Sequence, residues 1–300
     1  MLQTTYPQIN AFVEYLKFEK RYSKHTIVSY QTDLEQFFTF LISQYDSPAL
    51  SSISPGFVRS WLAEMRGEKI SPKSLNRKIS SLKSFYKFLI KQGEVRQSPL
   101  TTIVAPKVTK RLPSFVTEKD MKTLQNYIEF DDTWKGLTDK LLLELFYATG
   151  MRLSELIGLK ETHIDEAKSQ VKVLGKGNKE RIIPVSKKLV SQLVNYIDAK
   201  RKLNAEVNCV NLFINEKGKA LYPKYVYNAV KTNLTLVTTL QKKSPHILRH
   251  TFATHLTNNG ADLNAVKELL GHASLAATQI YTHNTIDKLK DVFKKSHPKA

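Results

Sequence analysis

The stretch "HILRHTFATHL", residues 246–256, places His246, Arg249 and His250 in an apolar helical pattern. Two histidines four residues apart share one helix face and could bind zinc, but the stretch lacks the glutamate of a metallopeptidase helix. Arg249 argues against a bound cation, because a guanidinium offers a planar fork of donors to phosphate oxygens. The stretch therefore indicates either an anion site or a set of hydrogen-bonded buried polar groups.

Four further polar segments could belong to the same site. In "ATGMRLSEL", Arg152 follows a glycine turn and precedes Glu155 by three residues, a spacing that by itself is typical of a surface ion pair. "LGKGNK" carries Lys176 in a basic turn, which alone is typical of a solvated loop. "LLGHASLAATQIYTH" adds His272 after a glycine and Tyr281 nine residues later, where a lone tyrosine is usually part of the packing. Together, cationic donors and an oxygen nucleophile suit attack on a phosphodiester.

The overall charge also favours a phosphate-bearing partner. The 300 residues carry a formal net charge of +19, with basic residues in excess on both sides of Lys110. A basic excess spread along a chain suits a polyanion such as nucleic acid, although charge that only promotes solubility is the alternative. Cys209 is the only cysteine, which excludes an internal disulfide and a zinc site made of several cysteines.

Neither a signal peptide nor a membrane span is predicted. The N-terminal residues 1–23 contain no continuous apolar run, and no later stretch reaches the roughly 20 apolar residues that a membrane span needs. We therefore expect a cytoplasmic protein without membrane contact.

The first hundred residues predict a bundle of about four helices that ends near Ser98. Residues 6–20 form the first helix, and a second begins behind Ser23. "SPGFVRSWLAEMRG" and "SPKSLNRKISSLKSFYKFLIKQG" both open with a serine cap and a first-turn proline and both end at glycine. Their charged residues off the apolar stripe indicate a solvated face, with DNA contact as the alternative. "SPLTTIVAPKVTKRLPSF" contains three prolines and no period, which indicates an interdomain linker.

Beyond the linker the pattern is mixed. "TEKDMKTLQNYI" predicts a capped helix, "TDKLLLELFYATG" predicts an apolar helix that stops at Gly150, and "RLSELIGL" restarts helix at once. "VKVL" and "RIIPV" have strand character and flank "GKGNKE", which predicts a β-hairpin with a basic tip. Helical stripes follow from Leu189 onward. The expected fold is mainly α, with one small β-hairpin or sheet in the second of two domains.

Five motifs, "GMRLSEL", "GKG", "HILRH", "LLGH" and "TQIYTH", occur in one order along this basic chain. In this the sequence resembles the tyrosine recombinases of the phage integrase family, specifically the Xer type, over nearly its whole length. The resemblance implies a SAM-like helical core-binding domain over residues 1–105 that clamps DNA, a linker over 106–114, and a mixed α/β catalytic domain over 115–300.

The resemblance also implies roles for individual residues. They are two phosphate-binding arginines, a hairpin lysine, two catalytic-site histidines, a nucleophile and a supporting carboxylate: Arg152 and Arg249, Lys176, His246 and His272, Tyr281, and Glu155, respectively. A tyrosine suits reversible strand transfer, because a phosphotyrosyl bond keeps the energy of the broken phosphodiester. No "GxxxxGK[ST]" loop and no carboxylate-rich signature of a two-metal nuclease is found, so we expect neither cofactor nor metal.

The implied partners are double-stranded DNA recombination sites and further recombinase protomers. Four protomers, of this chain alone or with a second Xer-type recombinase, would exchange strands through a Holliday junction and resolve chromosome dimers at cell division. A septal DNA translocase is a further possible partner. The apolar stripe of Ile286, Leu289 and Phe293 could dock on a neighbouring protomer or fold back in cis.

Three other functions remain open at this point. A mobile-element integrase would use the same chemistry, and a topoisomerase would only nick and reseal. A non-enzymatic regulator is the alternative from another class, because "NGADLNAVKELLGHASLAATQIYTH" also fits two short helices around a tight turn.

Overall fold

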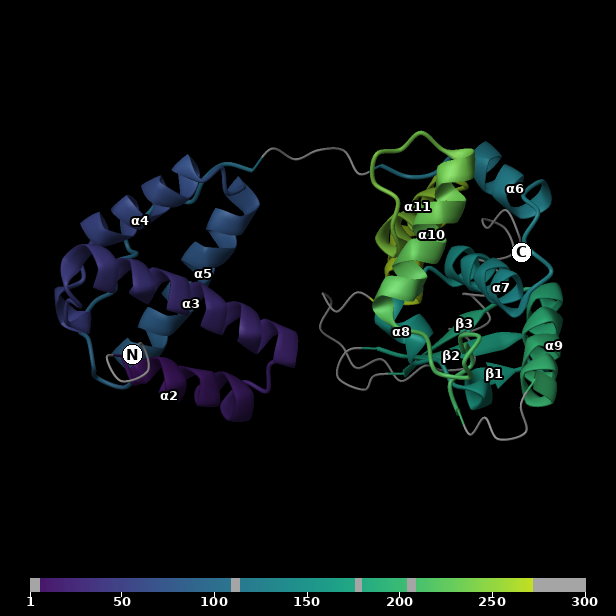
Figure 1. Cartoon of the computed structure of the whole chain (residues 1–300), viewed down its shortest axis with the longest axis horizontal. Helices are drawn as coiled ribbons and strands as arrows, with labels where there is room; N and C mark the ends of the chain where they lie inside the picture. The colour runs from purple at the N-terminus through teal and green to yellow at the C-terminus, as the bar shows by residue number, and fades with distance from the viewer. Residues whose placement is uncertain (1–5, 109–113, 176–179, 204–208, 272–300) are drawn as a thin grey trace. The chain divides into compact units, whose positions relative to one another are not determined.

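The computed structural model describes residues 6–108, 114–175, 180–203 and 209–271. The chain divides into two compact units, Met1–Arg111 and Leu112–Ala300, and each is described by itself (Figure 1). Among the described residues, no helix is long and apolar enough to cross a membrane.

The first unit is the predicted helical bundle. It contains α2 (Gln8–Glu14), which continues as one π-helical turn (Tyr15–Glu19), then α3 (Lys24–Tyr45), a 3-10 turn (Leu50–Ser52), α4 (Pro55–Gly67) and α5 (Pro72–Lys91). The predicted caps of α3 and α5 are confirmed, because Ser23 and Ser71 accept the backbone N–H groups of Thr26 and Ser74. Ser54 occupies the same place before α4, but its side chain makes no cap hydrogen bond.

Aromatic rings fill the core of this bundle, with Phe12, Phe37, Phe38, Trp61 and Phe85 almost fully buried. Beside them, the fully buried carboxylate of Asp33 on α3 accepts hydrogen bonds from three residues of α5. Asp33 therefore joins α3 to α5 through polar contacts in an otherwise apolar interior.

The second unit combines helices with a small sheet. Its elements are α6 (Glu118–Asn126), α7 (Trp134–Thr149), α8 (Leu153–Ile157), a 3-10 turn (Glu161–His163), β1 (Ile164–Asp165), β2 (Gln170–Leu174), β3 (Glu180–Pro184), α9 (Lys187–Leu203), α10 (Pro223–Val237), α11 (Pro245–Asn258) and α12 (Leu263–Leu270). The sheet is antiparallel in the order β1-β2-β3, with Val171 opposite Ile183, so the predicted hairpin is confirmed and gains a third strand. Helix α7 begins one turn earlier than predicted, because Thr133 caps it.

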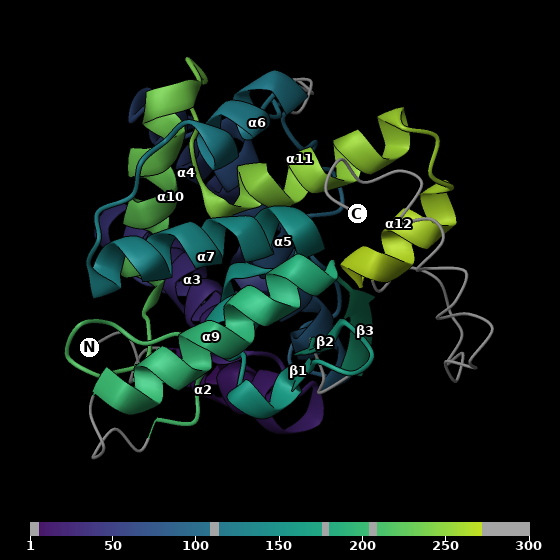
Figure 2. The same cartoon turned by 90° about the vertical axis from the view of Figure 1, so that its right-hand side faces the viewer.

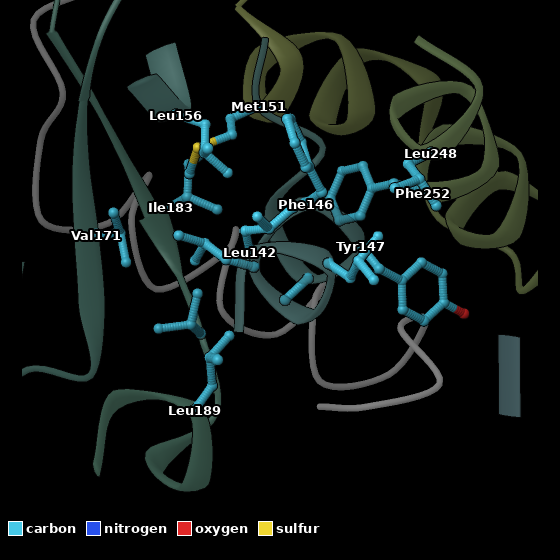
Figure 3. Close-up of a cluster of buried hydrophobic side chains, with 14 of the residues drawn as sticks. Leu142, Phe146, Tyr147, Met151, Leu156, Val171, Ile183, Leu189, Leu248 and Phe252 are labelled. Carbon is cyan, nitrogen blue, oxygen red and sulfur yellow. The ribbon is translucent and has the colours of Figure 1, made fainter. Parts of the chain in front are cut away.

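Helix α7 is the centre of this unit and is buried along most of its length. Figure 3 shows Leu142 and Phe146 of α7 between Val171 and Ile183 of the sheet and Phe252 of α11. All five side chains are essentially inaccessible to solvent. This packing fixes the ends of α7, α11 and β3 relative to one another, and those ends carry the polar residues described next.

Candidate active site

A glycine turn at the end of α7 sets the direction of the chain toward Arg152. Gly150 has a φ of +57°, and its N–H donates to the carbonyl of Phe146 over 2.8 Å. A Cβ atom at Gly150 would lie 2.3 Å from the ring of Phe252, so any other residue would clash as well as strain the backbone. Arg152 follows as the N-cap residue of α8.

Arg152 and Glu155 form a partly buried pair rather than the surface pair that their spacing suggests. The Arg152 backbone N–H donates to Glu155 Oε2 and its Nη1 donates to Oε1, each over 2.7 Å. The Glu155 side chain is 3% exposed and that of Arg152 is 32% exposed. Arg152 Nη2 donates to the carbonyl of Gly271 over 2.8 Å. The guanidinium is therefore held at the boundary between the interior and solvent.

Arg181 on β3 is the second partner of Glu155, and the sequence motifs did not single it out. Its Nη1 and Nη2 donate to the two Glu155 oxygens over 2.9 and 2.8 Å, and its Nε donates to the Leu269 carbonyl over 2.8 Å. The side chain is 5% exposed. A signal was present in "RIIPV". Arg181 lies two residues before Ile183, so both side chains point to the same, apolar face of the strand, where a cation needs a buried partner.

Arg249 enters the same region from α11. Its Nη1 donates to the carbonyl of Gly150 and its Nη2 to that of Leu270, both over 2.7 Å. Burial, together with repulsion from Arg152 and Arg181, lowers the pKa of Arg249 to about 10. The guanidinium therefore stays protonated at neutral pH, and a bound anion would be stabilised beside it.

The three arginines and Glu155, here called the arginine cluster, meet at one helix end. Arg181, Arg249 and Arg152 donate to three successive carbonyls, those of residues 269, 270 and 271. Figure 2 shows α12, which ends there, beside α11 and β3. The carbonyl end of a helix carries partial negative charge, which favours cations around it. The cluster holds three guanidiniums but only one carboxylate, which pairs with Arg152 and Arg181, so it has surplus positive charge for an anionic ligand.

Glu155 is ionised at neutral pH. Burial by itself would raise the pKa of its carboxyl, but hydrogen bonds from Arg181 and from the main chain and side chain of Arg152 outweigh burial and lower the pKa to about 2. The carboxylate thus keeps two guanidiniums within hydrogen-bond distance of one group.

The histidines of the stretch 246–256 have different surroundings. His246 lies exposed in the first turn of α11, one turn before Arg249. His250 is half-buried, with Nε2 3.4 Å from the Thr254 hydroxyl. His255 is fully buried, its Nδ1 lies 3.0 Å from the Tyr147 hydroxyl, and burial lowers its pKa, so it packs as a neutral ring.

Among the predicted site residues, the structure thus brings Arg152, Glu155 and Arg249 together, and it places His246 on the same helix as Arg249. Lys176, His272 and Tyr281 lie outside the described residues. Within the described ranges, no group of three or more histidine, cysteine, aspartate or glutamate side chains is arranged to hold a metal ion.

Family models and known proteins match most of the chain. A family model described as "Phage integrase family" matches residues 114–287, and one described as "Phage integrase, N-terminal SAM-like domain" matches residues 9–93. Tyrosine recombinase XerC of Staphylococcus saprophyticus is 41% identical over 294 residues, which cover 97% of this chain and 97% of the relative. Its counterpart in Halalkalibacterium halodurans is 39% identical over 297 residues, again covering 97% of each.

Solved structures show the same relationship. The XerH site-specific recombinase in a post-cleavage complex with its palindromic difH substrate has a TM-score of 0.71 and 26% identity, over 88% of this chain and 78% of that one. A lambda integrase dimer bound to a core site shares the fold, with a TM-score of 0.68 and 17% identity, over 92% of this chain and 98% of that one. The chain therefore belongs to the phage integrase family, as a tyrosine recombinase that acts in site-specific DNA recombination.

Proposed function

We propose that Arg152 and Arg249 of the arginine cluster bind the scissile phosphate of a DNA recombination site and that Tyr281 attacks it. The observation that carries this proposal is the convergence of Arg152 and Arg249 on the adjacent carbonyls of residues 270 and 271, with one carboxylate for three guanidiniums. Attack by the tyrosine oxygen spreads negative charge over the equatorial phosphate oxygens, and preorganised cationic donors stabilise that charge. The fold supplies such donors at fixed positions.

The remaining roles follow from the motifs. The Tyr281 hydroxyl gives up its proton to water and its oxygen forms a bond to phosphorus while the bond to the 5′ oxygen breaks, which leaves a 3′-phosphotyrosyl link. Lys176 protonates the departing 5′ oxygen as general acid, and His246 and His272 donate hydrogen bonds to the phosphate. The phosphotyrosyl bond conserves the energy of the phosphodiester, so a DNA hydroxyl can reverse the attack without ATP. Glu155 supports Arg152.

We further assign the two units separate tasks. Residues 1–105 clamp double-stranded DNA, residues 106–114 link the units, and residues 115–300 carry the chemistry. The ranges of the two family models and the division between Arg111 and Leu112 support this assignment. The net charge of +19 supports contact with DNA along both units.

The biological role that we propose is resolution of chromosome dimers at cell division, in the cytoplasm. The full-length likeness to proteins named tyrosine recombinase XerC supports it. Four protomers, of this chain alone or with a second Xer-type recombinase, would exchange strands through a Holliday junction, and a septal DNA translocase would activate them. A mobile-element integrase is the alternative use of the same chemistry.

The decisive experiment traps the covalent intermediate. Nicked suicide duplexes that carry candidate chromosomal recombination sites are incubated with the protein in EDTA, and a denaturing gel is read for a protein–DNA adduct. We expect an adduct with the wild type and none with Tyr281→Phe, whose DNA affinity stays nearly unchanged because the hydroxyl contributes chemistry more than binding.

Two outcomes would contradict the proposal. An adduct that persists in Tyr281→Phe would show that another residue is the nucleophile. Tight binding to several candidate sites without any adduct, even when a septal translocase domain is added, would favour the helix-turn-helix regulator. An adduct formed only on the ends of a mobile element would keep the chemistry and replace the role in dimer resolution.

A further inference from the structure

We propose that Arg181 is a positioning residue of the cleavage reaction, one that sets the geometry of Arg152 and of the end of α12 without touching DNA. This inference rests on the proposed function. Arg181 joins three elements through three hydrogen bonds, from β3 to Glu155 on α8 and to the Leu269 carbonyl on α12.

The contacts of Arg181 determine where the Glu155 carboxylate lies. Its planar fork donates to both carboxylate oxygens, which fixes the plane of the carboxylate as well as its position. The same two oxygens accept from the backbone and the Nη1 of Arg152. The orientation of the Arg152 guanidinium therefore depends on Arg181 through the shared carboxylate.

Arg181 also fixes the end of α12. Its Nε holds the Leu269 carbonyl, three residues before His272 in the sequence. A Cβ atom at Gly271 would lie 3.2 Å from Arg181 Cδ and Nη1, so the backbone at the end of α12 approaches the guanidinium side chain closely. Removing the guanidinium would release both the carbonyl and this close packing.

The exposure of the arginines separates their roles. Arg181 is 5% exposed and all three of its nitrogens donate to protein acceptors, two of them to Glu155, whereas Arg152 is 32% exposed. Arg249 is also buried, but it forms no ion pair within the described residues, so no carboxylate blocks its guanidinium. A phosphate arriving from solvent can reach Arg152 but would have to displace Glu155 to reach Arg181. Arg181 therefore acts on the reaction through the groups that it holds.

Lys200 on α9 provides a matched control. Its ammonium group is equally buried and donates to a carboxylate, Glu161, and to two main-chain carbonyls, those of Cys209 and Asn211. None of these acceptors belongs to the arginine cluster. Replacing Lys200 thus removes a buried cation of similar surroundings from the same unit without touching the groups assigned to the reaction.

The test compares Arg181→Gln, Arg181→Lys and Lys200→Met with the full-length wild type. Single-turnover cleavage of the suicide duplex is measured at saturating DNA, together with the DNA dissociation constant and the melting temperature. We expect Arg181→Gln to slow cleavage about 100-fold and to leave the dissociation constant unchanged. A displacement of about 1 Å at a reacting centre causes a loss of rate of this size. Arg181→Lys should recover part of the rate, because an ammonium keeps the charge but loses the planar fork. Lys200→Met should lower the melting temperature and leave the rate unchanged.

The outcomes separate this inference from the proposed function. If the wild type forms no adduct either with or without a septal translocase domain, the proposed function fails and this inference fails with it. If the wild type cleaves and Arg181→Gln cleaves equally fast, or binds DNA more weakly without a slower cleavage step, only the positioning role is wrong. If Arg181→Gln does not fold, Arg181→Lys decides in the same way, and loss of folding in both variants would make Arg181 a structural residue alone.

Discussion

Each unit contains a buried carboxylate that contacts two cationic side chains, Asp33 in the first and Glu155 in the second, and the two clusters differ in what the cations do with their other donors. Asp33 accepts from Lys78 Nζ over 3.1 Å, from the Ser81 hydroxyl over 2.8 Å, and from Arg77. Lys78 also donates to the Gln36 side chain and lies over the ring of Trp61. The cations around Asp33 therefore direct most of their other contacts to side chains, and the contact with Gln36 joins α5 to α3.

In the second unit the balance of charge is different. Glu155 pairs with Arg152 and Arg181, and Arg249 is a third guanidinium that forms no ion pair within the described part of the chain. Its acceptors are main-chain carbonyls. A buried ion cluster by itself is thus no sign of a site. A surplus of buried cations that only main-chain dipoles offset is the feature that indicates an anionic ligand.

The largest difference between the clusters should appear in catalysis. We expect Arg249→Gln to lower the cleavage rate constant by about 10³ to 10⁵-fold, because a guanidinium that stabilises charge on a transferred phosphoryl group contributes about that much. Arg77→Gln, which breaks an ion pair of the Asp33 cluster, should leave the rate at saturating DNA unchanged. Single-turnover cleavage of the suicide duplex measures both. Equal losses of rate in the two variants would show that the two clusters do not differ in function.

The two carboxylates should matter similarly for stability. Asp33→Asn and Glu155→Gln each leave buried cations without their counter-charge, so each should reduce the free energy of unfolding of its own unit by about 3 to 5 kcal/mol. Trp61 lies in the first unit and Trp134 in the second, and these are the only tryptophans. Urea unfolding followed by fluorescence in Trp134→Phe and Trp61→Phe backgrounds reports each unit separately.

The catalytic readout then separates the two variants. Of the pair, only Glu155→Gln should slow cleavage under conditions where both proteins are folded. A slow Asp33→Asn variant with normal DNA affinity would contradict the division between a structural and a functional cluster.

The smallest expected effect is the dependence of the unfolding free energy on pH. The pKa of Glu155 is lowered to about 2 in the folded protein, against about 4.3 for an unperturbed glutamate. Its contribution of about 3 kcal/mol is therefore complete above pH 5 and is lost as the pH falls from about 4.3 toward 2. The difference in unfolding free energy between wild type and Glu155→Gln, read in the second unit, should shrink over this range. A difference that stays constant down to pH 2.5 would show that the carboxylate is not stabilised as its contacts indicate.

Much of the architecture could be predicted from local patterns. The serine caps of α3 and α5, the stop at Gly150 and the two strands around "GKGNKE" depend on neighbouring residues, and the structure confirms them. The cap expected from Ser54 was wrong in its hydrogen bond, because the same sequence signal leaves the side-chain rotamer free. Local sequence signals therefore predicted which helices and strands form better than they predicted individual side-chain contacts.

The site could be predicted only in part. Arg152, Glu155 and Arg249 were found through motifs, and the roles of Lys176, His272 and Tyr281 stay predictions. Arg181 was missed because its partners lie 26 and 88 residues away along the chain, a distance that no local period reports. The same contact explains why Arg152 and Glu155 look like a surface pair in the sequence but are partly buried in the structure.

The grip on α12 has a consequence for how this helix tolerates change. Arg181, Arg249 and Arg152 hold carbonyl oxygens, which every residue type possesses, so the grip does not depend on which side chains α12 carries. The contacts depend instead on the number of residues in the helix. One inserted residue would turn the helix end by about 100° and advance it by about 1.5 Å, so that no carbonyl would face its arginine. Along α12, we therefore expect point substitutions on the solvent side to be tolerated and single-residue insertions or deletions to be eliminated by selection.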